Sequence, residues 1–265
     1  MKYTEKEKLF LNRIKSKTID NCKLCNNGFK EDRTECDCLI TFYFIKELAL
    51  SKIPESYWFL EFKELKIKSS IKMLISEYIK NINNALDKNL GFTFFGTNGT
   101  GKTSVMSVIG IQTIIKQKRV LYIRMKEIFD NIFKEDETLK ERIKSADLIL
   151  LDEFDKLYHK SQDWNIYNID DFIRENFDRK SIIICTNFAG GEEIKEIYGD
   201  SILSKILEFN KFVPFSGNDF RKEMNDKWLE RLKAEKIDYM KLLEQAKIYK
   251  KYRLEKDKEE YDIVI

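Results

Sequence analysis

The segment that most constrains the fold of this chain is a run of eight residues, GTNGTGKT, at Gly96–Thr103. The apolar run LGFTFF at residues 90–95 precedes it and predicts a buried strand, and the pattern after it predicts a helix to about residue 117. Its glycines allow the backbone to bend closely around phosphate oxygens, while successive backbone N–H groups and the helix N-terminus attract anions. The segment matches GxxxxGK[ST] between a strand and a helix, so we interpret it as a phosphate-binding loop rather than a chance Gly-rich turn.

Two side chains of this loop are expected to act on the ligand. The Lys102 ammonium should reach the β- and γ-phosphates of a nucleotide, and the Thr103 hydroxyl should ligate Mg²⁺. The predicted nucleotide-binding residues are Gly96, Thr97, Asn98, Gly99, Thr100, Gly101, Lys102, Thr103, Ser104 and Asp152.

A second apolar run, LILL at residues 148–151, predicts a buried strand that ends in two acids, Asp152 and Glu153. Asp152 is expected to hold Mg²⁺, mostly through water, because this ion dehydrates reluctantly. Glu153 is placed to polarise the water that attacks the γ-phosphate. A strand that merely ends in solvated acids is the alternative; the spacing of about 50 residues from Lys102 favours the catalytic interpretation.

A third buried strand, at residues 181–188, ends in polar residues. Asn187 at its end is predicted to orient the hydrolytic water or to contact the γ-phosphate, and the alternative is an asparagine that only caps a loop. Cys185 lies inside the strand and is expected to behave as a small buried apolar residue.

Further apolar runs predict strands at residues 120–125 and 211–215. Helical patterns alternate with the strands, and continuous apolar strands indicate a parallel sheet that is covered on both faces. The predicted fold is therefore α/β, with five parallel strands. After Arg221 we expect a long charged helix to about residue 258, which packs on its own domain or on a partner helix. The predicted helices before it span residues 4–17, 40–50, 70–86, 126–145, 166–178 and 192–209.

Charge and hydropathy restrict the class of protein. Forty-eight Lys and Arg against 45 Asp and Glu leave a formal charge of +3, which excludes a generally basic nucleic-acid coat protein. No apolar segment is long enough to cross a membrane, and the N-terminus lacks the apolar core of a signal peptide. We therefore expect a cytoplasmic protein that has no membrane partner and whose thiols stay reduced.

Four of the five cysteines cluster near the N-terminus, in the pattern Cys22-x₂-Cys25-x₁₀-Cys36-x-Cys38. Two close pairs separated by a turn can converge on one tetrahedral ion, and four thiolates are a typical set of structural zinc ligands. Basic residues nearby, at positions 23, 30 and 33, could partly offset the negative charge of such a centre. An iron–sulfur cluster and four unrelated reduced cysteines are the alternatives.

The three strand-end motifs, in this order, resemble the Walker A, Walker B and sensor 1 elements of AAA+ ATPases, over about residues 50–222. The added cysteine cluster makes the chain similar to DnaC/DnaI-type replicative helicase loaders, especially those of phages and mobile elements. Three further segments carry this resemblance: IPESY at residues 53–57, GDSILSKI at residues 199–206 and VPFSGNDFR at residues 213–221.

The resemblance implies roles for two more cations. Lys205 occupies the position of an arginine that reaches the nucleotide site of a neighbouring subunit, and Arg221 matches the sensor 2 arginine that contacts the γ-phosphate in cis. Lysine keeps the charge but loses the planar fork that grips a phosphate with two parallel bonds. The alternative for both residues is an ordinary surface position.

The resemblance further implies an ATPase that uses ATP and Mg²⁺ to load a hexameric replicative helicase onto single-stranded DNA, while its AAA+ domains associate side by side. Cations after the second strand are candidate DNA contacts, although they could equally form a solvated helix face: Lys134, Lys140, Arg142 and Lys144. The predicted division is a zinc-binding module at 1–48, an ATPase domain at 49–222 and a helical extension at 223–265. The alternatives are an IstB-like ATPase that regulates DNA transposition and a nucleotide-gated adaptor that scarcely hydrolyses ATP.

Overall fold

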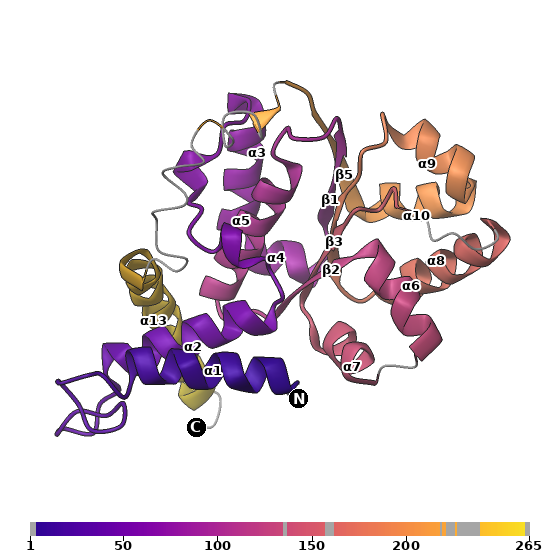
Figure 1. Ribbon diagram of the computed structural model, residues 1–265. Coiled ribbons are helices and arrows are strands. Elements are labelled where there is room, and N and C mark those ends of the chain that lie inside the picture. The colour runs from indigo at the N-terminus through magenta and orange to yellow at the C-terminus, as the bar shows by residue number, and fades with distance from the viewer. Residues whose placement is uncertain are drawn as a thin grey trace.

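In a computed structural model of the chain, five parallel strands form one sheet in the order β2-β3-β4-β1-β5 (Figure 1). This confirms the predicted α/β class and the five parallel strands. The strands are β1 Gly91–Gly96, β2 Val120–Arg124, β3 Leu148–Asp152, β4 Ser181–Cys185 and β5 Asn210–Phe215.

The structure describes residues 4–134, 137–156, 162–217, 219–220, 226 and 239–262, without the side chains of 131–134, 162–166, 168, 239–241 and 254–262. Among the helices in these ranges, none combines the length and the apolar character needed to cross a membrane. The helices are α1 Glu5–Thr18, α2 Asp37–Leu50, α3 Ser69–Lys80, α4 Ile82–Asp87, α5 Lys102–Ile115, α6 Met125–Lys134, α7 Glu137–Ser145, α8 Gln162–Phe177, α9 Gly191–Tyr198, α10 Asp200–Phe209 and α13 Tyr239–Asp262, with two short 3₁₀ helices, η1 Glu55–Tyr57 and η2 Phe62–Glu64.

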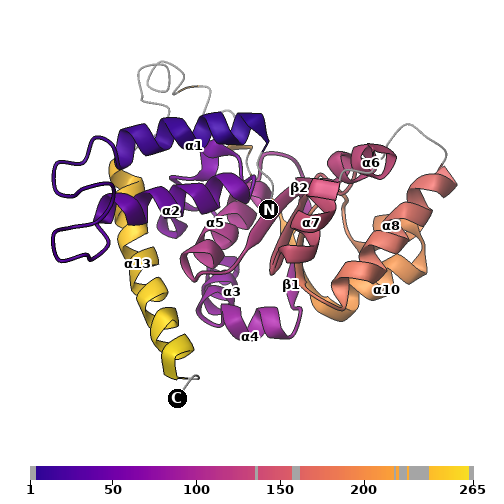
Figure 2. The ribbon, with the colours of Figure 1, turned by 90° about the horizontal axis from the view of Figure 1, so that it is seen from below.

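Helices cover both faces of the sheet. Successive side chains of a strand point to opposite faces, and here both faces are apolar and must be buried. Leu148 and Leu150 of β3 join a first core, beneath α1 to α5 and α13. Ile149 and Leu151 of the same strand join a second core, beneath α6 to α10. Figures 1 and 2 show the two groups of helices on opposite sides of the sheet.

The topology brings three loops to one edge. Strands β1 and β3 both pair with β4 in parallel, so the segments that follow β1, β3 and β4 leave from the same, carboxyl edge of the sheet. Ligands of open parallel sheets bind at this edge, where the strand order reverses. All three predicted catalytic motifs therefore meet at one place.

Three predicted helices are each divided in two, and local chemistry explains two of the breaks. Gly199 has φ of +91°, a left-handed conformation that glycine tolerates, and it separates α9 from α10. At Asn81, between α3 and α4, the side-chain amide donates to the carbonyl and carboxylate oxygens of Glu77, which competes with continued helix. The third break separates α6 from α7.

The C-terminal helix α13 packs in cis, against α2 and α5, which decides between the two predicted alternatives for this part of the chain. Its buried residues Leu242, Ala246 and Tyr249 belong to the first core. Ion pairs join Lys250 to Asp37 at 2.9 Å and Arg253 to Glu35 at 3.0 Å. The predicted helical positions 228, 229, 232 and 237 lie outside the described residues.

Arg142 was predicted among the DNA-contacting cations, and the structure shows that this prediction is wrong. Its side chain is only 3% exposed, and Nη2 donates to Glu7 Oε2 of α1 at 2.8 Å. In the helical spacing of α7, Arg142 follows Leu139 by three residues, so both lie on the buried face. The pair anchors α1 to the body of the protein. Lys140 and Lys144 on the same helix are exposed.

Removing Glu7 from this pair is expected to destabilise the fold. Glu7→Ala leaves the buried guanidinium without its partner, which typically costs about 3–5 kcal/mol in the free energy of unfolding. Urea unfolding measures the loss, and Glu5→Ala is the matched control because Glu5 is exposed on the same helix. Equal unfolding midpoints for the two variants would contradict the assignment.

The stability that the Glu7–Arg142 pair contributes depends on pH. Burial alone would raise the pKa of Glu7, but hydrogen bonds from Arg142 and Thr4 outweigh it, so the folded-state pKa lies below the usual value. The stabilisation is therefore present above the ordinary carboxyl range and is lost as pH falls through the folded pKa.

The N-terminal helices do not have a core of their own among the described residues. Ile14 of α1 and Phe44 of α2 belong to the same buried cluster as Val105 and Ile109 of α5. The predicted boundary near residue 48 is therefore crossed by continuous apolar packing, and α5, which begins at Lys102 of the Gly96–Thr103 loop, packs on α2.

Candidate functional site

The segment between β1 and α5 adopts a conformation that only glycine accommodates well. Gly99 and Gly101 have φ of +77° and +95°. A Cβ at Gly99 would lie 1.9 Å from Asp219 Oδ1, whereas a Cβ at Gly101 would enter open space directly before the N-terminus of α5. The unpaired backbone N–H groups of a first helical turn favour an anion at such a helix N-terminus. The residues present therefore fit a bound phosphate.

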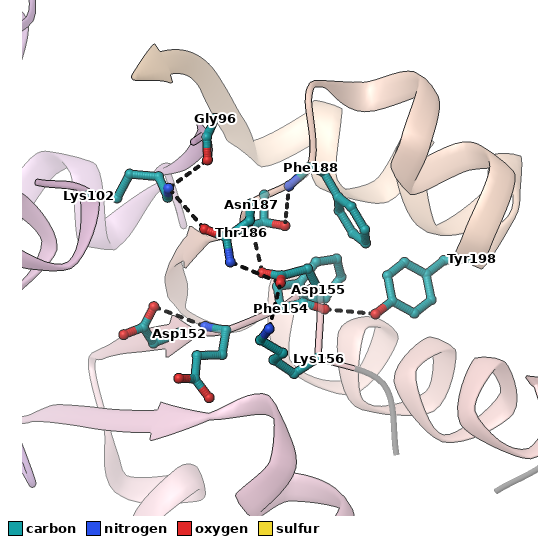
Figure 3. Close-up of polar contacts among 11 residues, drawn as sticks. Gly96, Lys102, Asp152, Phe154, Asp155, Lys156, Thr186, Asn187, Phe188 and Tyr198 are labelled. Carbon is teal, nitrogen blue, oxygen red and sulfur yellow. Dashed lines mark hydrogen bonds and ion pairs between the residues drawn. The ribbon is translucent and has the colours of Figure 1, made fainter. Parts of the chain in front are cut away.

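Lys102 links this loop to the end of β4. Its Nζ donates to the Gly96 carbonyl oxygen at 2.6 Å and to Asn187 Oδ1 at 3.1 Å (Figure 3). It also donates to the Thr97 carbonyl oxygen at 2.7 Å. The side chain is buried although it is charged. The structure thus brings together two residues that the sequence assigned to one catalytic site, 85 positions apart.

Thr103 and Asp152 also meet, as predicted for a shared metal ion. Thr103 Oγ1 lies 3.2 Å from Asp152 Oδ2 and 3.4 Å from Oδ1. A hydroxyl and a carboxylate are oxygen donors of the kind that Mg²⁺ prefers. The pair therefore fits this ion.

Asp152 is held by a residue that sequence reasoning missed. Tyr122 of β2 donates its hydroxyl to Asp152 Oδ2 at 2.7 Å, and the Glu153 backbone N–H donates to Oδ1 at 2.9 Å. Burial, together with the negative charge of Asp152, raises the pKa of Tyr122, so its hydroxyl stays protonated and remains a donor. In the sequence Tyr122 is only one residue of the apolar run at 120–125, and the pairing of β2 with β3, in which Arg124 lies opposite Asp152, brings it to this carboxylate.

Glu153 follows Asp152 in a strained conformation. Its φ is +56°, which is uncommon for a residue with a side chain. The turn closes with a hydrogen bond from the Lys156 backbone N–H to the Glu153 carbonyl at 2.9 Å. Strain of this kind concentrates at functional sites, and Glu153 stands at the strand end where the sequence predicted it. Its catalytic role stays a prediction.

The remaining loop residues differ in exposure. Thr100 is buried and its hydroxyl donates to the Thr97 carbonyl at 2.9 Å, whereas Asn98 is exposed and Ser104 is half-buried in the first turn of α5. Beside Thr100 lies a cavity of about 240 Å³. Besides Thr100, its lining includes four apolar side chains and two lysines: Ile67, Ile71, Phe215, Phe220, Lys66 and Lys68.

Lys205 has partners within its own chain. It forms ion pairs with Asp178 at 2.6 Å and Glu208 at 3.1 Å, neither of which belongs to the phosphate-binding loop. The hydrogen bond to Asp178 is the main cause that raises the pKa of Lys205, so the cation is secure at neutral pH. A role in a neighbouring subunit stays a prediction. Arg221 lies outside the described residues.

The four clustered cysteines converge as predicted. Their sulfur atoms all lie within 4.8 Å of one another, with Cys22 3.7 Å from Cys36 and Cys25 3.4 Å from Cys38. In a tetrahedral zinc site with Zn–S bonds of about 2.3 Å, neighbouring sulfurs are separated by about 3.8 Å. The cluster therefore fits a zinc module.

Local structure explains how two of these ligands are presented. Cys36 is the N-cap of α2 and Cys38 lies in its first turn, where the helix N-terminus favours thiolates. A tight turn at Asn26–Phe29, with φ of +49° at Asn27 and +95° at Gly28, reverses the chain between the pairs. Burial and the three neighbouring thiols raise the pKa of Cys38, a charge conflict that a divalent cation would relieve.

Cys185 is buried in the first core, as predicted, and its thiol lies 3.5 Å from the Met106 sulfur. It is remote from the cluster in sequence and belongs to the sheet, so it supplies no ligand there.

Comparison with protein families matches residues 44–227 to the IstB-like ATP binding protein family. Among solved structures, the chain is similar to a DnaC helicase loader at 21% identity, with a TM-score of 0.53 over 62% of this chain and 100% of the other. It is similar to DnaI at 12% identity, with a TM-score of 0.51 over 63% and 93%. A DNA replication initiation factor matches at 18% identity, with a TM-score of 0.51 over 74% and 64%.

No curated protein matches the chain. At the identities above, the solved structures establish likeness of fold, whereas the family match covers most of the chain. Together they confirm the predicted resemblance and the AAA+ P-loop fold.

Proposed function

This chain belongs to the IstB-like ATP-binding family, and from this premise we propose that it uses ATP to load a replicative DNA helicase onto single-stranded DNA. The family and the fold make it an ATPase of the P-loop class. The helicase as partner is the further step, and it is supported by the cysteine cluster and by the similarity of fold to the helicase loader. The proposal places the protein in the cytoplasm.

The residues at the carboxyl edge of the sheet have separate roles in ATP hydrolysis. The loop at Gly96–Thr103 binds the phosphates through backbone N–H groups, and Lys102 neutralises their charge. Thr103 and Asp152 would hold Mg²⁺, which would stabilise the negative charge of the phosphates. Glu153 accepts the proton of the attacking water. The apolar cavity beside Thr100 receives the nucleotide base.

The observation that carries the loader assignment is the attachment of the cysteine cluster to the ATPase core. Cys36 and Cys38 begin α2, and α2 packs directly on α5, the helix that starts at Lys102. Helix α13 is joined to the residues on either side of Cys36 by the ion pairs of Lys250 with Asp37 and of Arg253 with Glu35. Packed helices thus connect the phosphate-binding loop to the cysteine cluster. This connection suits a protein that binds a partner in one nucleotide state and releases it in another.

The cluster also offers a surface for the partner. Leu24, between the first two cysteines, is 81% exposed, and Phe29 on the adjacent turn is 47% exposed. Large exposed apolar side chains that lie close together are typical of protein–protein contact sites. We propose that these two residues contact the helicase.

Leu24→Asp is therefore expected to abolish capture of the purified replicative helicase, because a charge replaces an apolar anchor that would be buried in the complex. Capture is measured on the immobilised chain with ATP and with ADP. Met73→Asp is the matched control, since Met73 is 69% exposed on α3, away from the cluster. Thermal unfolding of both variants checks that they are folded. Full capture by Leu24→Asp would remove Leu24 from the proposed contact.

The chain would meet DNA and its own copies through other surfaces. Lys140 and Lys144 remain candidate contacts for single-stranded DNA, while the side chain of Lys134 lies outside the described residues. Side-by-side association would bring Lys205 of one copy towards the nucleotide of the next. In this arrangement residues 1–48 serve as the partner-binding module and 49–222 as the ATPase domain, while α13 of the extension at 223–265 braces the module.

The family match itself favours a second candidate, an IstB-like ATPase that regulates DNA transposition by forming filaments on duplex DNA. Electron micrographs of the protein with ATP and duplex DNA, together with the helicase capture assay, distinguish the two functions. Filaments on duplex DNA together with no capture of helicase would support the second candidate, whereas helicase capture without filaments supports the first.

A further inference from the structure

The carboxylate of Asp155 makes two hydrogen bonds with Asn187. The Asn187 backbone N–H donates to Oδ1 at 2.9 Å, and its side-chain Nδ2 donates to Oδ2, also at 2.9 Å (Figure 3). Asp155 follows β3 and Asn187 follows β4, and these strands are neighbours in the sheet. One carboxylate therefore fixes both the main chain and the side chain of Asn187.

This contact decides which way the Asn187 amide faces. Because Nδ2 points to a carboxylate, Oδ1 is left to accept from Lys102 Nζ at 3.1 Å. The opposite orientation would set the amide oxygen against the carboxylate and the amide nitrogen against the ammonium, and both contacts would be repulsive. The charges on the two sides thus hold the amide in one orientation.

Asp155 is itself held in place. It belongs to the turn of residues 153–156, whose Phe154 is completely buried in the second core. Tyr198 of α9 packs on Phe154 with ring centroids 4.9 Å apart and donates its hydroxyl to the Phe154 carbonyl at 2.7 Å. The Asp155 side chain is only 11% exposed, with Lys156 Nζ 3.8 Å from Oδ2. The turn that carries Glu153 therefore also carries the group that fixes Asn187.

We propose that Asp155 is a positioning residue for ATP hydrolysis, which sets Asn187 relative to Lys102 and Glu153. Asp155 touches neither phosphate nor water; it acts through Asn187. The inference rests on the ATPase site and on the role of Asn187 there, and it does not require a helicase. The two Asp155–Asn187 hydrogen bonds lie within one chain, so the inference does not depend on association with a second copy.

The test is steady-state ATP hydrolysis by the isolated chain carrying Asp155→Asn. This substitution keeps the shape but replaces one acceptor by a donor, so one N–H of Asn187 must face another N–H. The expected result is a fall in kcat of roughly 10- to 100-fold, the loss that follows from one charge-assisted hydrogen bond. The KM for ATP and the affinity for ATP should stay unchanged, because the loop and Lys102 still bind the phosphates.

Asp171→Asn is the matched control, since it removes the same charge from an exposed position on α8. It should leave both kinetic constants unchanged. Wild-type kcat in Asp155→Asn would overturn the proposal. So would a rise in KM that parallels a fall in the melting temperature, because that pattern indicates a general loss of structure.

If Asp155→Asn folds but is too unstable for kinetic measurements, the exchange of the two residues keeps the proposal testable. In the double variant Asp155→Asn with Asn187→Asp, the new amide donates to the new carboxylate and accepts the backbone N–H at position 187. Its melting temperature should therefore lie well above the value that the two single variants add up to. Strictly additive losses would overturn the contact. Neither the kinetic constants nor the melting temperatures involve a helicase, so these results are independent of the loader assignment.

Discussion

Glu153→Gln is expected to lower the rate of ATP hydrolysis by roughly 10²- to 10⁴-fold, the usual contribution of a positioned general base. The neutral amide keeps the size of the side chain but cannot accept a proton from water. Binding of ATP should persist, because the phosphates are held by the Gly96–Thr103 loop and by Lys102. The measurement is single-turnover hydrolysis together with binding of a fluorescent ATP analogue.

The matched control for this variant is Glu141→Gln, which makes the same chemical change at an exposed position of α7. It should hydrolyse ATP at the wild-type rate. Lys102→Ala should instead lose ATP binding, which separates the two roles. If Glu153→Gln hydrolysed ATP as fast as the wild type, Glu153 would not be the base. If the wild type itself scarcely hydrolysed ATP, the nucleotide-gated adaptor would become the better description.

The second large effect is expected at the cysteine cluster. Elemental analysis should find about one zinc per chain, since four thiolates complete one tetrahedral site. Cys22→Ser should lose this zinc, and amide exchange in residues 20–38 should rise to that of an unfolded segment. A structural zinc site contributes about 10 kcal/mol or more of apparent binding energy in small domains, and this stretch has few buried side chains to replace it.

Cys185→Ala is the control, because it removes a thiol that lies in the core of the sheet. It should keep the full zinc content. ATP binding by Cys22→Ser should persist, since the phosphate-binding loop is formed by β1 and α5. A metal-free protein with a fully protected segment 20–38 would refute the zinc assignment, and iron with acid-labile sulfide would point to an iron–sulfur cluster.

The sequence predicted the elements whose signal is local. The apolar runs at residues 90–95, 148–151 and 182–185 identified three buried strands, because a strand buried on both faces has few polar residues. The polar residues after them were assigned to one site because the three motifs, in this order, resemble Walker A, Walker B and sensor 1, and the parallel strands do bring them to one edge of the sheet. The convergence of the four cysteines was also predicted from a local pattern, namely two close pairs separated by a turn.

What the sequence could not predict depends on contacts between distant segments. Asp155 and Tyr122 became visible only when the register placed them beside Asn187 and Asp152. Arg142 was predicted as a DNA contact because it is one of the four candidate cations of a charged helical stretch, yet Glu7, 135 residues away, pairs with it and allows its burial. The cis packing of α13 could not be distinguished from packing on a partner helix, because both need the same apolar stripe.

The most direct test of the loader assignment is the amount of hexameric replicative helicase that becomes active on single-stranded DNA coated with binding protein. The purified chain with ATP is expected to increase this amount strongly, and the Glu153→Gln variant is expected to bind helicase without completing repeated loading. If helicase loading is the same with and without the chain, in ATP and in ADP, the protein is not a helicase loader.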